Sequence, residues 1–97
     1  MDSLNKLISE RIVILDGAMG TMLQQCGLSG DNEMFNFAHP EAVRKIHDEY
    51  ISAGADIIET NSFGANRISQ AEYGAGDRAG EMAFQSAKIA KAAAAAA

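Results

Sequence analysis

Two short runs of branched aliphatic residues stand out against the mixed polarity of the rest of the chain. One is Arg11-Ile-Val-Ile-Leu15 and the other is Asp56-Ile-Ile-Glu-Thr60. Neither run alternates regularly between polar and apolar positions, which is typical of strands that are buried on both faces in a parallel sheet. We therefore expect two short buried strands, at Ile12–Leu15 and at Asp56–Thr60.

Helical spacing governs the segments between and after these runs. The clearest helix begins at Pro40, because proline is favoured in the first helical turn, and ends at Gly54. Its apolar stripe is Val43, Ile46, Tyr50 and Ala53. Other helices are predicted at Leu4–Glu10, Thr21–Gln25 and Asn66–Tyr73, and a last one from Asp77 has the stripe Ala79, Met82, Ala83, Ala87 and Ala90. The order strand, helix, strand, helix predicts a parallel α/β fold.

Composition narrows the class of protein. The 97 residues favour one small domain, and the net charge of −5 with scattered Lys and Arg argues against nucleic acid or an anionic membrane as a partner. No segment approaches the roughly 18–20 apolar residues that span a bilayer, and the N-terminus lacks the apolar run of a signal peptide. The single cysteine, Cys26, excludes an internal disulfide. We therefore expect a cytoplasmic protein.

Polar residues that could carry chemistry follow both predicted strands. Asp16-Gly-Ala-Met-Gly-Thr21 follows the first, and Glu59-Thr-Asn61 ends the second. Ligands of α/β folds bind at the carboxyl ends of the strands, so the two clusters would share one site. The carboxylate of Asp16 could pair with an ammonium group, and the N–H groups of Gly17 and Ala18 could hold a carboxylate. This combination suits an α-amino acid, although Asp16-Gly17 could equally be a turn and Glu59 and Asn61 solvated loop residues.

Other candidate residues favour structural roles. Cys26 has no neighbouring base, and His39 and His47 have no second ligand at zinc spacing, so we expect them to pack or to lie at the surface. Asp31-Asn-Glu33 lacks the surrounding calcium loop and predicts a turn. We expect no metal site within this chain.

Several strings resemble the homocysteine S-methyltransferase family. They are Ile14-Leu-Asp-Gly-Ala-Met-Gly-Thr-Met-Leu23, His39-Pro-Glu41, Ile46-His47, Tyr50, Ala53-Gly-Ala-Asp-Ile-Ile-Glu-Thr-Asn61, Phe63 and Ala65-Asn66. The resemblance runs from about Arg11 to Lys91. Gly30-Asp-Asn-Glu33 and Gly64-Ala-Asn66 are more similar to cobalamin-dependent methionine synthases. Bifunctional homocysteine methyltransferase–methylenetetrahydrofolate reductases are close, and the betaine-dependent branch is more distant.

The resemblance implies a (βα)8 TIM barrel, of which residues 1–97 would be the N-terminal part and Ala92–Ala97 a poly-alanine tail of unidentified origin. It implies methyl transfer to the zinc-activated thiol of homocysteine, forming methionine. The zinc-binding cysteines of the family have no counterpart here, so the ligands of zinc would lie outside this chain. Cobalamin and tetrahydrofolate would act through methyl-donor domains of the same polypeptide.

For the site, the resemblance implies that Asp16 faces the substrate ammonium group and that Gly17 and Ala18 donate to its carboxylate. Glu59, Thr60 and Asn61 would complete the amino-acid end of the pocket. Two hypotheses remain open, an enzyme fragment with part of its pocket and a non-catalytic α/β interaction module. In either case we expect the isolated chain to be inactive, and either poorly folded or self-associating.

Overall fold

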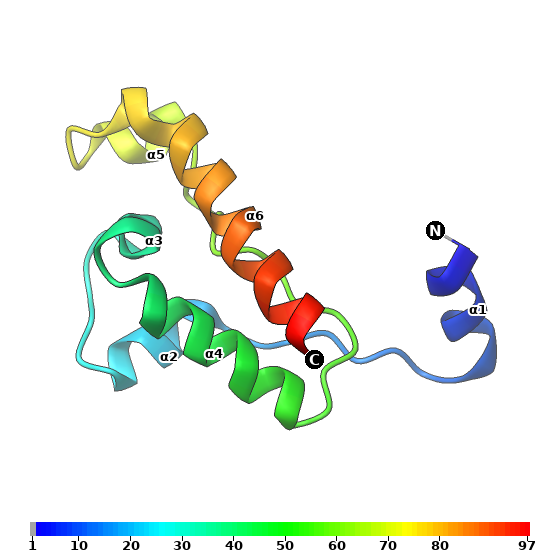
Figure 1. Cartoon of the computed structure of the whole chain (residues 1–97). Coiled ribbons are helices and arrows are strands. Elements are labelled where there is room, and N and C mark those ends of the chain that lie inside the picture. The colour runs from blue at the N-terminus through cyan, green and yellow to red at the C-terminus, as the bar shows by residue number, and fades with distance from the viewer. Residues whose placement is uncertain (1) are drawn as a thin grey trace.

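Helices make up most of the computed structural model, which describes residues 2–97 (Figure 1). The elements in chain order are α1 (Asp2–Glu10), α2 (Met19–Gln25), the 3₁₀ turn η1 (Asn32–Met34), α3 (Phe35–Ala38), α4 (Pro40–Ser52), α5 (Arg67–Ala71), the 3₁₀ turn η2 (Gly76–Arg78) and α6 (Ala79–Ala96). None of these helices is both long and apolar enough to cross a membrane.

The predicted α/β fold built from barrel units is wrong, because no strand forms within residues 2–97. The two aliphatic runs do lie side by side, but they meet at a single parallel bridge between Leu15 and Ile57. Asp16 N donates to Ile57 O at 2.9 Å, and Asp56 N donates to Ile14 O at 2.7 Å. An isolated pair of extended segments is marginal without further neighbours, and one bridge is too short to make a sheet.

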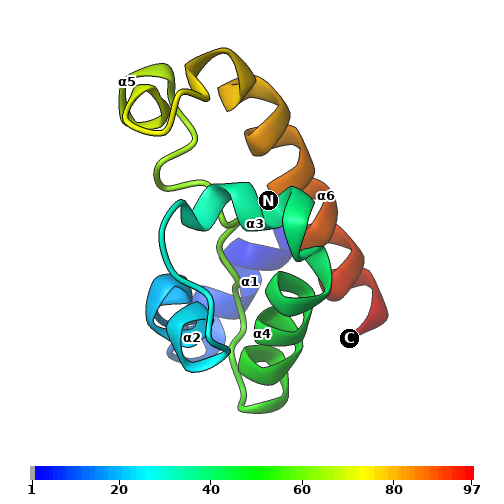
Figure 2. The same cartoon turned by 90° about the vertical axis from the view of Figure 1, so that its left-hand side faces the viewer.

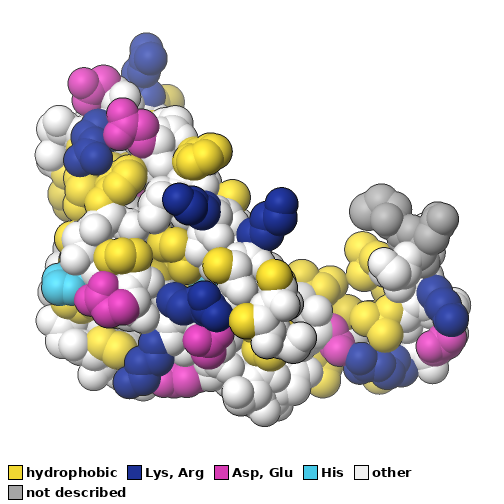
Figure 3. All heavy atoms as spheres, in the orientation of Figure 1, with side chains coloured by type: hydrophobic (Ala, Val, Ile, Leu, Met, Phe, Trp, Pro, Cys, Tyr) yellow, Lys and Arg dark blue, Asp and Glu magenta, His cyan; other side chains and the backbone are white. Residues whose placement is uncertain are grey.

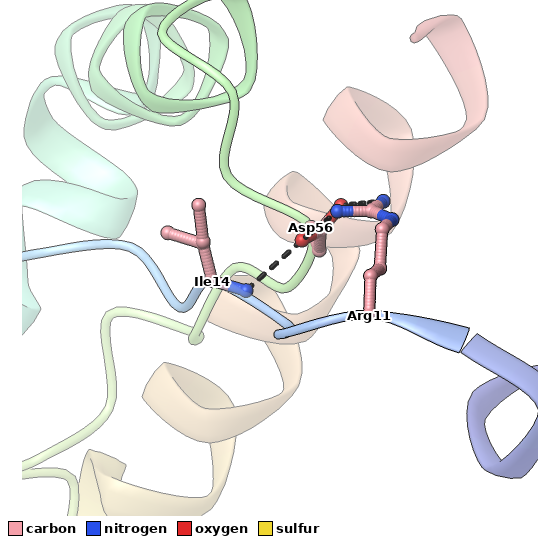
Figure 4. Close-up of polar contacts among 3 residues, drawn as sticks. All are labelled: Arg11, Ile14 and Asp56. Atoms are coloured by element: carbon pink, nitrogen blue, oxygen red, sulfur yellow. Dashed lines mark hydrogen bonds and ion pairs between the residues drawn. The ribbon is translucent and has the colours of Figure 1, made fainter. Parts of the chain in front are cut away.

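Beyond the backbone pairing, the side chain of Asp56 continues the hydrogen bonding between the two runs. The N–H of Ile14 donates to Asp56 Oδ2 at 2.9 Å, and the Arg11 guanidinium binds both oxygens of the same carboxylate (Figure 4). This pairing raises the pKa of Arg11 and lowers the pKa of Asp56. Asp56 therefore ties the two segments together at the end away from their polar clusters.

The core lies between helices, with α4 packed against α2, α3 and α6 (Figure 2). Pro40 begins α4 as predicted, and Val43 and Ile46 from its apolar stripe are fully buried. They pack with Leu23 of α2 and Ile89 of α6. This small aliphatic cluster holds together the body that carries the polar clusters.

The predicted stripe of α6 is only partly correct. Met82 and Ala90 are buried, whereas Ala83 and Ala87 are exposed. The buried face of the helix is Met82, Ser86, Ile89, Ala90 and Ala93. Because α6 is rich in alanine, its faces differ little in hydrophobicity, and the sequence alone could not locate the buried one. The buried face is the one that packs against α3 and α4.

The first helix projects from the body as an arm (Figure 1). In the space-filling view, hydrophobic side chains are visible along this arm and where it joins the body (Figure 3). Ile12 is 87% exposed, and Ile14 and Leu15 are each more than half exposed. The first aliphatic run therefore has one partner segment and otherwise faces solvent.

Candidate functional site

A cavity of about 410 Å³ opens where the two aliphatic runs end. The structure places all six predicted site residues along its wall: Asp16, Gly17, Ala18, Glu59, Thr60 and Asn61. These residues come together because the parallel Leu15–Ile57 bridge places the residues that follow each run beside one another. The convergence therefore needs only one parallel contact and no sheet.

Asp16 has one occupied and one free carboxylate oxygen. Its Oδ2 accepts a hydrogen bond from Glu59 N at 3.0 Å, which fixes the side chain against the second run. Its Oδ1 is buried and has no hydrogen-bond partner among the described residues. A buried carboxylate oxygen without a hydrogen-bond donor costs free energy, and a donor on a bound ligand would remove that cost.

The backbone at Gly17 and Ala18 forms another part of the wall. No hydrogen bond joins the N–H of either residue to another described residue. Tyr50 of α4 supports this stretch, because its hydroxyl donates to Ala18 O at 3.3 Å. A Cβ on residue 17 would lie 2.7 Å from the same hydroxyl oxygen, so the close approach requires glycine. The two N–H groups therefore lie at the cavity wall without a protein acceptor among the described residues.

Asn61 reaches the cavity but directs its side-chain amide into the protein. Its Nδ2 donates to Asn32 O at 2.9 Å and to Asn36 Oδ1 at 3.3 Å. Asn36 Nδ2 donates back to Asn61 O at 2.9 Å, and both residues are buried. This amide therefore serves to join the second run to α3 and η1.

Glu59 and Thr60 lie at the exposed rim of the cavity. The Thr60 and Ser62 hydroxyl groups are hydrogen-bonded to one another. Phe63 is fully exposed beside them, and Tyr73 lines the same cavity. Glu59 is thus the polar rim residue whose side chain can still meet a ligand.

Sequence reasoning missed Asn32 and Glu33, which also line the cavity. The sequence predicted a turn here, and the structure forms one, the 3₁₀ turn η1, but the turn also faces the cavity. Partial burial raises the pKa of Glu33. The run of three polar residues after Gly30 was the available signal, but nothing in the sequence shows that it faces the two clusters.

His47 was expected to pack or to lie at the surface, and the structure buries it completely. Burial lowers its pKa, and the negative charge of Asp16 opposes this shift. It does not line the cavity. Cys26 is exposed and also lies outside it.

The sequence matches the homocysteine S-methyltransferase family over residues 13–97. The chain belongs to this family, since the match covers most of its length. The reaction of the family is methyl transfer to homocysteine, which is its substrate.

Zinc, on which the family generally depends, does not fit the side chains of this chain. Within residues 2–97 no three His, Cys, Asp or Glu side chains gather as a metal would require. We expect the purified chain to bind no stoichiometric zinc, because a lone exposed cysteine cannot supply a tetrahedral site. Equilibrium dialysis against submicromolar zinc tests this, and one tightly held zinc ion per chain would contradict it.

Proposed function

We propose that this chain forms the amino-acid end of the homocysteine pocket in a methyltransferase of the methionine synthase type. Its methyl group would come from methylcobalamin and methyltetrahydrofolate through other domains, and the zinc ligands would lie outside residues 1–97. The observation that carries the proposal is the buried, unpartnered Oδ1 of Asp16 at a cavity wall.

The binding geometry follows from what each group can offer. The Asp16 carboxylate accepts hydrogen bonds from the substrate ammonium group while Glu59 N holds its other oxygen in place. The N–H groups of Gly17 and Ala18 donate to the substrate carboxylate. Glu59 and Thr60 complete the rim, and Asn61 supports the wall through its buried amide contacts.

The charge of the cavity agrees with an ammonium-bearing ligand. Its lining includes the carboxylates of Asp16, Glu33 and Glu59 and no Lys, Arg or His among the described residues. A purely anionic ligand would meet repulsion there, whereas an α-amino acid brings a compensating positive charge.

Replacing Asp16 with asparagine is expected to weaken homocysteine binding. The amide oxygen can still accept from Glu59 N, so the fold is kept while the charge-assisted contact is lost. The loss should be about 1.5–3 kcal/mol, or about 10- to 150-fold in Kd. Saturation-transfer difference NMR with homocysteine measures the affinity, and it tolerates self-association of the protein.

The matched control is Asp77→Asn, an exposed aspartate of η2 that does not line the cavity. It should bind homocysteine as the parent does. Equal affinity in the Asp16→Asn variant and the parent would remove Asp16 from the site.

A further inference from the structure

Glu33 is a carboxylate of the cavity wall whose position is fixed by contacts with distant parts of the chain. It lies in η1, and its half-buried carboxylate meets the loop that follows Asn61. The backbone of Gly64 lies beside this carboxylate and partly offsets the rise in the pKa of Glu33 that burial causes. A Cβ on residue 64 would collide with Glu33 Oε1, so the carboxylate lies against the Gly64 backbone and would have to shift if residue 64 were larger.

Buried side chains hold this contact from behind. Gln70 is fully buried, and its Nε2 donates to Gly64 O at 2.9 Å and to Asp31 Oδ1 at 3.0 Å. These bonds fix the loop at Gly64 relative to the segment that carries Glu33. The Glu33 carboxylate is therefore held in position by contacts between residues far apart in sequence. A turn that only faced solvent would not require such contacts.

The position is electrostatically unfavourable for an ionised carboxylate. Glu33 forms no ion pair with any described residue, and the nearby Asp31 adds a second negative charge. Burial of an unpaired carboxylate opposes its ionisation. A cation brought into the cavity would stabilise it, together with Asp16.

We propose that Glu33 determines specificity for a free amino group on the ligand of this cavity. The inference rests on the proposed function, and it goes beyond it by assigning selection for the ammonium form to a second carboxylate. Asp16 makes the direct contact, whereas Glu33 adds negative potential that favours the zwitterionic amino acid, with its ammonium group, over its anionic N-acyl derivative.

The test compares homocysteine with N-acetylhomocysteine on the full chain, again by saturation-transfer difference NMR. Glu33→Gln should weaken homocysteine binding about 3- to 10-fold, as expected for one partly screened charge, and should leave binding of the anionic N-acetylhomocysteine unchanged or slightly stronger. Glu33→Asp keeps the charge and should retain at least part of the preference. Glu72→Gln, at an exposed glutamate outside the cavity, should bind both ligands as the parent does.

Thermal unfolding of the same variants separates a structural role from a role in specificity. Glu33→Gln should be at least as stable as the parent at neutral pH, because it removes an unpaired charge from a half-buried position. If it fails to fold, Glu33→Ala serves as the second neutral variant, with the same expected loss of preference.

The outcomes distinguish this inference from the function on which it rests. No homocysteine binding by the parent chain would overturn the proposed function. Binding that depends on Asp16 but keeps its full preference in the neutral Glu33 variants would overturn the role of Glu33 alone. An equal loss for both ligands would likewise overturn it and leave Glu33 a structural residue.

Discussion

Replacing Ile46 with alanine is expected to lower the free energy of unfolding by about 2–5 kcal/mol, the range for deleting a buried aliphatic side chain. Ile46 is fully buried in the cluster that joins α4 to α2 and α6. A domain of this size has a total stability of about 5–15 kcal/mol, so the variant would lose a large share of it. Urea unfolding followed by circular dichroism, at one fixed protein concentration, measures the change.

The matched control is Ile68→Ala, the same substitution at a side chain that is 87% exposed. Its unfolding free energy should differ from that of the parent by no more than about 0.5 kcal/mol. If both variants lost the same stability, the cluster around Ile46 would not be the core of the chain.

The second large effect concerns catalysis, since the isolated chain is expected to convert no homocysteine to methionine. Activation of the thiol needs a metal ion or a suitable base, and the described cavity wall includes the carboxylates of Asp16, Glu33 and Glu59 but no Cys, His or Lys. A methyl-transfer assay with homocysteine and either methylcobalamin or methyltetrahydrofolate tests this. Turnover by the chain alone would mean that it activates the thiol by another route.

Self-association of the chain is expected to accompany this inactivity. The first aliphatic run presents exposed Ile12, Ile14 and Leu15, and its backbone is paired at a single bridge. Exposed apolar segments with unpaired backbone groups favour pairing with a second chain. Light scattering should show an apparent mass that rises with concentration, whereas a monomer at all concentrations would contradict the expectation.

Helices could be predicted from the sequence where local signals agree. Pro40, the stripe of α4 and the glycine that follows it locate that helix almost to the residue. The sheet could not be predicted correctly, because strand formation depends on neighbours that lie far away in sequence. Ile57 is a β-branched residue of the kind that favours buried strands, but its only backbone bridge within the described residues is to Leu15.

The cavity residues were predictable to the extent that they follow the two aliphatic runs. The contacts that shape the cavity were not, because they join distant residues with no local pattern. Asn36 and Asn61 are 25 positions apart, and Gln70 reaches Asp31 across 39. Such amide contacts satisfy buried groups in three dimensions, and no periodicity in the sequence reports them.

The contact between Gly17 and Tyr50 links two positions that should vary together in any redesign of this protein. Enlarging residue 17 alone would force a methyl group against a ring held by α4, whereas shortening residue 50 first would open room beneath that backbone. An engineer who wanted a deeper pocket would therefore begin at Tyr50 and keep Gly17. A library that randomised both positions should recover bulk at residue 17 only in clones whose residue 50 has become smaller.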